Sequence, residues 1–248
     1  KELSNGKIDE TGLNKGLFSL ATGMEICDYY DDVMQNTFLQ SGQVQYFPNC
    51  NYLGNNEFES LESSEKYQVE VRKKIVDCSY FDTKVPATHT PNFEIAEGVQ
   101  FMPLNDLPKV TEQPEGYVII GAGKTGIDAI LYLLENKVNP DKITWIVSRD
   151  GWLLNRKNTQ PSLQFFENTF GVLASQNEAI IKAKSKEDLF YGLEKAGLFV
   201  RIDETIRPQM FHGATVSELE LEQLRRLKNV VRLGRVQSLE NEQIILNK

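Results

Sequence analysis

Hydrophobic and polar positions follow a strand–turn–helix–strand pattern in residues 116–149. Tyr117–Ile120 is a short apolar run, typical of a buried parallel strand. After a glycine-rich turn, apolar residues recur at helical spacing, at Ile127, Ile130, Leu131 and Leu134. The Asn139-Pro140-Asp141 sequence ends this helix, and residues 143–147 form a second apolar run. The order predicts a βαβ unit of about 30 residues.

The pattern before this unit predicts a helix followed by short strands. Residues 24–38 have helical periodicity, which Ser41 and Gly42 end. Strands are expected at residues 44–47 and 74–78, and at the alternating positions around Tyr67, with a turn at Gly54-Asn55-Asn56. Prolines then punctuate a segment that we expect to be an irregular linker, at Pro86, Pro91, Pro103, Pro108 and Pro114.

The pattern after the unit predicts helices and then a β-meander. Helices are expected at residues 177–183 and Lys186–Lys195, and a third follows a capping-box signal that begins at Thr215 or at Ser217. Strands are expected at residues 230–233, 236–239 and 243–246. Helix, strand and meander therefore occur in both residues 24–72 and 218–246. Either the chain is a slice through two consecutive dinucleotide-binding domains, or meanders are common and the likeness has no meaning.

The turn of the βαβ unit reads Gly121-Ala122-Gly123-Lys124-Thr125-Gly126, a complete G-x-G-x-x-G. In this context Gly121 permits a tight turn, Gly123 lets a pyrophosphate approach the backbone, and Gly126 lets helix and strand pack closely. The helix N-terminus offers free N–H groups to phosphates, and Thr125 adds a hydroxyl donor. A nucleotide-triphosphatase loop would need a glycine at the position of Val118. Dinucleotide binding is the favoured interpretation, against a glycine turn without a ligand.

Composition narrows the class of protein. The 248 residues have a formal net charge of −8, which argues against nucleic-acid and anionic-membrane partners. No apolar run approaches the roughly 18 residues of a membrane-spanning helix, and no signal peptide is visible. Cys27, Cys50 and Cys78 are widely spaced, as expected of reduced thiols in the cytoplasm. We expect a small-molecule substrate, and the sequence leaves open whether the chain forms a homo-oligomer.

The residues of the βαβ unit resemble the two-dinucleotide-domain flavoproteins, which include pyridine-nucleotide disulfide reductases and flavin-containing monooxygenases. Residues 121–128 are similar to the monooxygenase NADPH fingerprint G-x-G-x-S-G-x-D, with Thr125 in place of serine. Residues 146–151 are similar to the end of the second strand in thioredoxin-reductase-like NADPH domains. The chain lacks a second G-x-G-x-x-G for FAD, the linker motif of the monooxygenases and the dithiol of the reductases.

The resemblance implies an α/β fold class with a Rossmann-type parallel sheet and a β-meander. Residues 115–248 would form the NAD(P)-binding domain, with a helical insertion at about 155–215, and residues 1–114 part of an FAD-type domain and linker. Each domain is expected to have its own parallel-sheet core. Ser79 lies where the family's chain touches flavin.

Residues at the end of the second predicted strand bear on the choice of nucleotide. The neutral Ser148 followed by Arg149 favours NADP over NAD, because NADP domains place an arginine near the 2′-phosphate. Asp150 argues against this, since a carboxylate repels a phosphate. Asp141 has the spacing of an NAD-binding acid but precedes the strand. Arg156 is a candidate second phosphate ligand.

These observations predict an FAD-dependent oxidoreductase, or a piece of one, that uses NADPH to reduce flavin by hydride transfer. The alternative is a module that binds NAD(P) without turnover.

Overall fold

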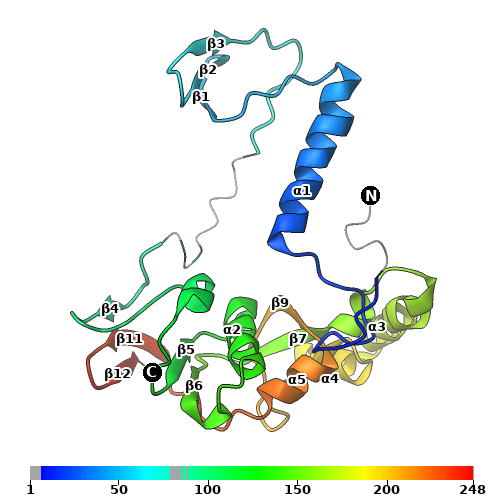
Figure 1. Ribbon diagram of the computed structural model, residues 1–248. Helices are drawn as coiled ribbons and strands as arrows, with labels where there is room; N and C mark the ends of the chain where they lie inside the picture. The colour runs from blue at the N-terminus through cyan, green and yellow to red at the C-terminus, as the bar shows by residue number, and fades with distance from the viewer. Residues whose placement is uncertain (1–6, 79–84, 86, 88, 248) are drawn as a thin grey trace. The chain divides into compact units, whose positions relative to one another are not determined.

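The computed structural model describes residues 7–78, 85, 87 and 89–247. These residues divide into two compact units, one containing residues 20–78 and the other residues 7–19 with the described residues from 85 onward. Residues 89–114 thus belong with the second unit. The fold is mixed α/β with small sheets, some of them parallel (Figure 1).

The first unit begins with a helix that the sequence predicted. Helix α1 (Gly23–Val33) starts with a capping box between Thr22 and Glu25. It continues through a π turn (Met34–Phe38) and a 3-10 turn (Leu39–Ser41) and ends at Gly42, whose φ is +67°. The expected helix at residues 24–38 and its end are therefore confirmed.

The first unit then forms an antiparallel meander, with the strand order β1-β2-β3. The turn at Asn55 and Asn56 is confirmed, and both residues have positive φ. Residues 44–47 and 74–78 are not strands, and the expected parallel-sheet core is wrong for the described residues of this unit. Both segments are exposed along their length, and neither forms a β-ladder with another described strand that would satisfy its backbone groups. The strands are β1 (Cys50–Gly54), β2 (Glu57–Ser60) and β3 (Lys66–Gln68).

The second unit is built on a parallel sheet with the order β10-β6-β5. Its strands are β5 (Tyr117–Ile120), β6 (Ile143–Ile146) and β10 (Val230–Val231). Helix α2 (Lys124–Glu135) connects β5 to β6, and a 3-10 turn (Pro140–Lys142) precedes β6. Helix α5 (Glu218–Leu224) precedes β10 and contacts α2. The strands, turn and helix of the predicted βαβ unit are confirmed.

The parallel sheet lies between two layers. On one face Ile119 and Trp145 pack with Ile127 of α2 and Leu224 of α5. On the other face the ends of β5 and β6 pack against β11 (Arg235–Leu239) and β12 (Ile244–Asn247), a predicted hairpin that is confirmed. Strand β4 (Glu94–Ile95), which the sequence did not predict, pairs in parallel with β11. The other described residues of the proline-rich segment have little regular structure apart from a 3-10 turn (Leu104–Lys109), as expected.

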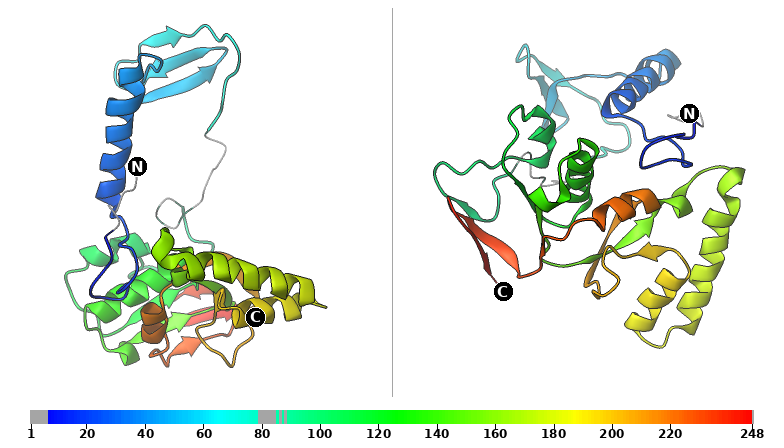
Figure 2. Two further views of the ribbon diagram at one scale, coloured as in Figure 1. Left: turned by 90° about the vertical axis from the view of Figure 1, so that its right-hand side faces the viewer. Right: turned by 60° about the horizontal axis from the view of Figure 1, so that its bottom comes forward.

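The described residues form one more sheet, ordered β8-β7-β9, which was not predicted. Its strands are β7 (Gly151–Asn155), β8 (Phe199–Val200) and β9 (Met210–Val216). Helices α3 (Val172–Lys182) and α4 (Lys186–Lys195) lie between β7 and β8 in sequence and are seen side by side in Figure 2. Short turns precede them, namely 3-10 turns at Arg156–Thr159 and Leu163–Phe165 and a π turn at Glu167–Gly171. Within the described ranges, every helix is too short or too polar to span a lipid bilayer.

Candidate nucleotide-binding site

The glycine turn lies at the carboxyl end of β5 and has the conformation that its sequence predicted. Gly121 has φ +108°, a value that side chains other than glycine's rarely allow. Its N–H donates to the Ile146 carbonyl at 2.9 Å, which anchors the turn to β6. Its carbonyl accepts a hydrogen bond of 2.8 Å from Nε1 of Trp145, a side chain that is 1% exposed. Two hydrogen bonds between Gly121 and β6 therefore fix the turn.

The other two glycines differ in what surrounds them. A Cβ on Gly126 would lie 2.6 Å from the Gly121 carbonyl oxygen, so only glycine fits at this crossing of helix and turn. A Cβ on Gly123 would have no atom of the described residues within 4 Å apart from its chain neighbours. Gly126 is thus required by the fold, whereas the space over Gly123 is open for a ligand.

Helix α2 begins at this open position without a side-chain cap. Its N-cap residue is Gly123, and no side chain in the described part of the chain accepts from its first N–H groups. Helices α1, α4 and α5 are each capped by a hydroxyl, from Thr22, Ser185 and Ser217. The first turn of α2 therefore presents unsatisfied donors and the positive end of the helix dipole. Thr125 is exposed in this turn, and Ala122 is half-buried before it.

The ammonium group of Lys124 is directed toward two carboxylates. It lies 2.5 Å from Asp128 Oδ1, one turn along α2, and 3.8 Å from Glu220 Oε1 on α5. Glu220 is 5% exposed and accepts from the Ser217 N–H at 2.6 Å, completing the capping box of α5 in the second of the two expected registers. Lys124 therefore ties α2 to α5, a role that the sequence did not indicate.

The turn after β6 presents Ser148 and Arg149, which are both exposed. The neighbouring carboxylate of Asp150 is engaged by the guanidinium of Arg232, with Nε 2.9 Å from Oδ2 and a terminal nitrogen 3.2 Å from Oδ1. Arg232 follows β10, so it lies at the same edge of the sheet as Arg149. Its charge offsets the repulsion that Asp150 would exert on a phosphate.

A second carboxylate contributes to this network. Asp203 Oδ2 lies 3.5 Å from Arg232. Two hydrogen bonds from Thr205 lower the pKa of Asp203: the one from the hydroxyl has the larger effect, and the one from the backbone N–H the smaller. Arg232 was missed from the sequence because its partners are distant in the chain. The expected strand at residues 230–233 included Arg232, whereas β10 ends at Val231 and leaves Arg232 in the turn that follows.

Other sequence-based candidates are not brought to this site. Arg156 is 7% exposed, and its guanidinium donates to Asn14 Oδ1. The five-residue strand β7 separates it from the Ser148–Arg149 turn, about 15 Å at the usual rise per residue. Its expected role as a phosphate ligand is therefore not supported. Trp152 is 4% exposed and packs with Phe199 in the core of this unit.

One further expectation concerns flavin. Ser79, the flavin-contact candidate, lies outside the described residues. In the part of the chain that the structure describes, no cluster of three His, Cys, Asp or Glu side chains could hold a metal ion. Cys27, Cys50 and Cys78 are all free thiols.

Replacing Trp145 tests the support of the turn. In Trp145→Phe the Gly121 carbonyl loses its buried donor, which costs about 1–3 kcal/mol of stability and loosens the loop. We expect nucleotide affinity to fall about three- to tenfold. Trp152→Phe is the matched control: it alters a buried tryptophan in another cluster and should lower stability without changing affinity. Equal affinities of the two variants, measured by calorimetry beside their thermal unfolding, would show that the bond does not position the turn.

Comparison with known proteins gives relatives but no function. The chain is 45% identical over 250 aligned residues to uncharacterized protein Rv2000 of Mycobacterium tuberculosis (strain H37Rv) and uncharacterized protein Mb2023 of Mycobacterium bovis. Each alignment covers 100% of this chain and 46% of the relative, so the chain spans about half the length of the curated relatives it matches. No family model and no solved structure matches the chain.

Proposed function

We propose that residues 115–248 form a Rossmann-type NADP-binding domain of an FAD-dependent oxidoreductase. The glycine turn is the observation that carries the proposal. It combines a positive φ at Gly121, a packing requirement at Gly126, open space over Gly123 and an uncapped helix N-terminus. Ligands of parallel α/β sheets bind outside the carboxyl ends of the strands, where this turn lies. A pyrophosphate fits this cradle, because its oxygens accept from N–H groups that no side chain satisfies.

The turns after β6 and β10 support a preference for NADPH over NADH. Arg149 is exposed at the carboxyl end of β6, and Ser148 brings no negative charge beside it. Arg232 holds the carboxylate of Asp150. In this arrangement Arg149 binds the 2′-phosphate. Lys124, directed to Asp128 and Glu220, keeps the start of α2 against α5 and does not act as a phosphate ligand.

The rest of the protein supplies the flavin site and the substrate site in this proposal. Residues 1–248 contain no second G-x-G-x-x-G, so FAD is assigned to parts of the full-length protein outside this chain. NADPH, when bound, supplies the hydride that reduces the flavin. The residues of this chain bind the pyrophosphate, select the 2′-phosphate and orient the nucleotide. The monooxygenase resemblance favours a small-molecule substrate, and the free thiols favour a cytoplasmic location.

Absorbance of the full-length protein tests the proposal. We expect a flavin spectrum after purification that bleaches when NADPH is added without oxygen. Bleaching should be lost in Gly123→Val, while dithionite still reduces the flavin in that variant. A protein that binds NADPH but carries no flavin would be the non-catalytic NAD(P)-binding module instead.

A further inference from the structure

Residues 7–19 form a closed loop that belongs to the second unit. Ile8 and Phe18 pair in an antiparallel bridge at its base. Within the loop, the Leu17 N–H donates to the Asn14 carbonyl at 2.9 Å. We therefore expect the loop to dock and to leave as one piece.

Two buried polar side chains hold this loop against the rest of the unit. Arg156 is 7% exposed, and its guanidinium donates to Asn14 Oδ1. Gln160 is also 7% exposed, and its Oε1 accepts from the Phe18 N–H at 2.8 Å. Removing the partner of a buried charged donor costs far more than removing that of an exposed one. The buried charge of Arg156 therefore favours the docked loop.

A third buried side chain links the loop to helix α5. Ser217 is 4% exposed, and its hydroxyl donates to the Leu13 carbonyl at 2.5 Å. The same hydroxyl accepts from the Glu220 N–H at 3.0 Å, and Glu220 Oε2 accepts from the Ser217 N–H at 2.6 Å. Because the hydroxyl hydrogen is given to the loop, the oxygen lone pairs are left to cap the helix. The docked loop thus orients the capping box of α5.

The capping box in turn reaches the glycine turn. The second carboxylate oxygen of Glu220, Oε1, lies 3.8 Å from the ammonium group of Lys124. Lys124 is the first residue of α2 and directly follows Gly123, the open position of the turn. One series of polar contacts therefore runs from the loop through Ser217 and Glu220 to the uncapped start of α2.

We propose that residues 7–19 are a positioning element of the nucleotide site, with Ser217 as its positioning residue. The docked loop holds the capping box of α5, and the box holds Lys124 and the first turn of α2 where the pyrophosphate meets them. The ligand in this inference rests on the proposed function. By linkage, a nucleotide that binds more tightly to the docked state also stabilises the docked loop by the same factor.

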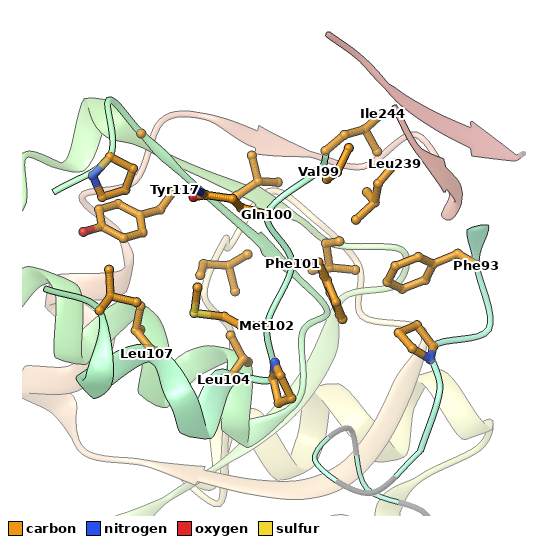
Figure 3. A pocket seen from close by; sticks show the side chains of 18 of the residues that line it. Phe93, Val99, Gln100, Phe101, Met102, Leu104, Leu107, Tyr117, Leu239 and Ile244 are labelled. Atoms are coloured by element: carbon orange, nitrogen blue, oxygen red, sulfur yellow. The ribbon is translucent and has the colours of Figure 1, made fainter. Parts of the chain in front are cut away.

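The loop lies apart from the apolar cavity beside β5, which has a volume of about 1440 Å³ (Figure 3). Neither residues 7–19 nor Ser217, Glu220 and Lys124 line this cavity. Its wall includes Phe101, whose ring meets that of Phe93 edge to face at 5.5 Å. Phe101→Leu is therefore a matched control, because it loosens the same unit without changing a contact of the loop.

Hydrogen exchange of the full-length protein without nucleotide, resolved to single amides, tests the positioning. In Asn14→Ala the buried Arg156 loses its partner, and the Phe18 amide should exchange at least about tenfold faster. The Ser217 and Glu220 amides should become faster with it. Asn14→Asp gives Arg156 a charged acceptor and should slow all three. An unchanged Phe18 amide in Asn14→Ala, unchanged Ser217 and Glu220 amides, or equal acceleration in Phe101→Leu would overturn the proposal.

Calorimetric titration of the same variants tests the effect on the site. Asn14→Ala should weaken the binding of NADPH and of NADH about five- to tenfold alike, because the coupling acts through the pyrophosphate that both contain. Phe101→Leu should leave both affinities unchanged, and saturating NADPH should slow exchange at Phe18 in the wild type. If the wild type binds no NADPH, the proposed function fails. If it binds NADPH and Asn14→Ala binds it equally tightly, the coupling alone is overturned.

Discussion

Gly123→Val should abolish dinucleotide binding and leave the fold intact. A Cβ at this position has no atom of the described residues within 4 Å apart from its chain neighbours, so we expect the native structure to accommodate the larger side chain. Loss of the glycine that is favoured at the N-cap lowers the free energy of unfolding by less than about 1 kcal/mol. The valine also reduces the conformational freedom of the unfolded chain, which raises this free energy by about as much. The valine would occupy the space where the pyrophosphate approaches the backbone. We expect NADPH affinity to fall at least about 100-fold, or roughly 2.7 kcal/mol, with an unchanged unfolding temperature.

Gly126→Ala in the same turn is the control with the opposite pattern. Its Cβ would lie 2.6 Å from the Gly121 carbonyl oxygen, so backbone must move. We expect a loss of about 1–3 kcal/mol in stability, as for other overpacked sites. Thermal unfolding and calorimetric titration of both variants make the comparison. Wild-type affinity in Gly123→Val would remove the site from this turn, and unchanged stability in Gly126→Ala would refute the close packing.

Arg149→Ala should weaken NADPH binding about ten- to 100-fold and leave NADH binding unchanged. An arginine meets a phosphate with a charge-assisted pair, commonly worth about 1.5–3 kcal/mol, and NADH has no 2′-phosphate. Arg207→Ala is the matched control, since it removes an exposed arginine that pairs with Glu187 on another part of the unit. An unchanged ratio of NADPH to NADH dissociation constants would mean that Arg149 does not select the nucleotide.

Arg232 provides an independent test of the same preference. In Arg232→Gln the carboxylate of Asp150 loses its bidentate partner. Its negative charge is then no longer offset and repels a phosphate bound at the neighbouring Arg149. NADPH affinity should fall about three- to tenfold, and NADH affinity should change less. If both nucleotides lose affinity equally, Arg232 maintains the structure of the site and does not set the nucleotide preference through its charge.

The sequence predicted those features that depend on neighbouring residues. The βαβ unit follows from apolar periodicity, and the conformations at Gly121 and Gly126 follow from turn chemistry that six residues specify. The sheet β8-β7-β9 was missed because β7 pairs with β9, about 60 residues later in the chain, and no local pattern records that pairing. Residues 44–47 were predicted as a strand on composition alone, but a strand needs a partner to satisfy its backbone.

In the candidate site, too, the sequence predicted the features that depend on neighbouring residues and missed those that depend on distant ones. The glycine turn, Ser148 and Arg149 were found because each follows a predicted strand directly. The pairing of Asp150 with Arg232 joins residues 82 apart in sequence, so only the fold brings them together. Arg156 was assigned to the site because strand β7 was not predicted. Nothing in the sequence therefore indicated that this strand separates Arg156 from the Ser148–Arg149 turn.

Calorimetric titration of the full-length wild-type protein with NADPH, and separately with NADH, is the most direct test of the proposed site. We expect saturable binding of one NADPH per chain, about ten- to 100-fold tighter than NADH, the factor that a charged hydrogen bond to the 2′-phosphate provides. Absence of binding by either nucleotide at millimolar concentration would contradict the site itself, and tighter binding of NADH would contradict the role of Arg149.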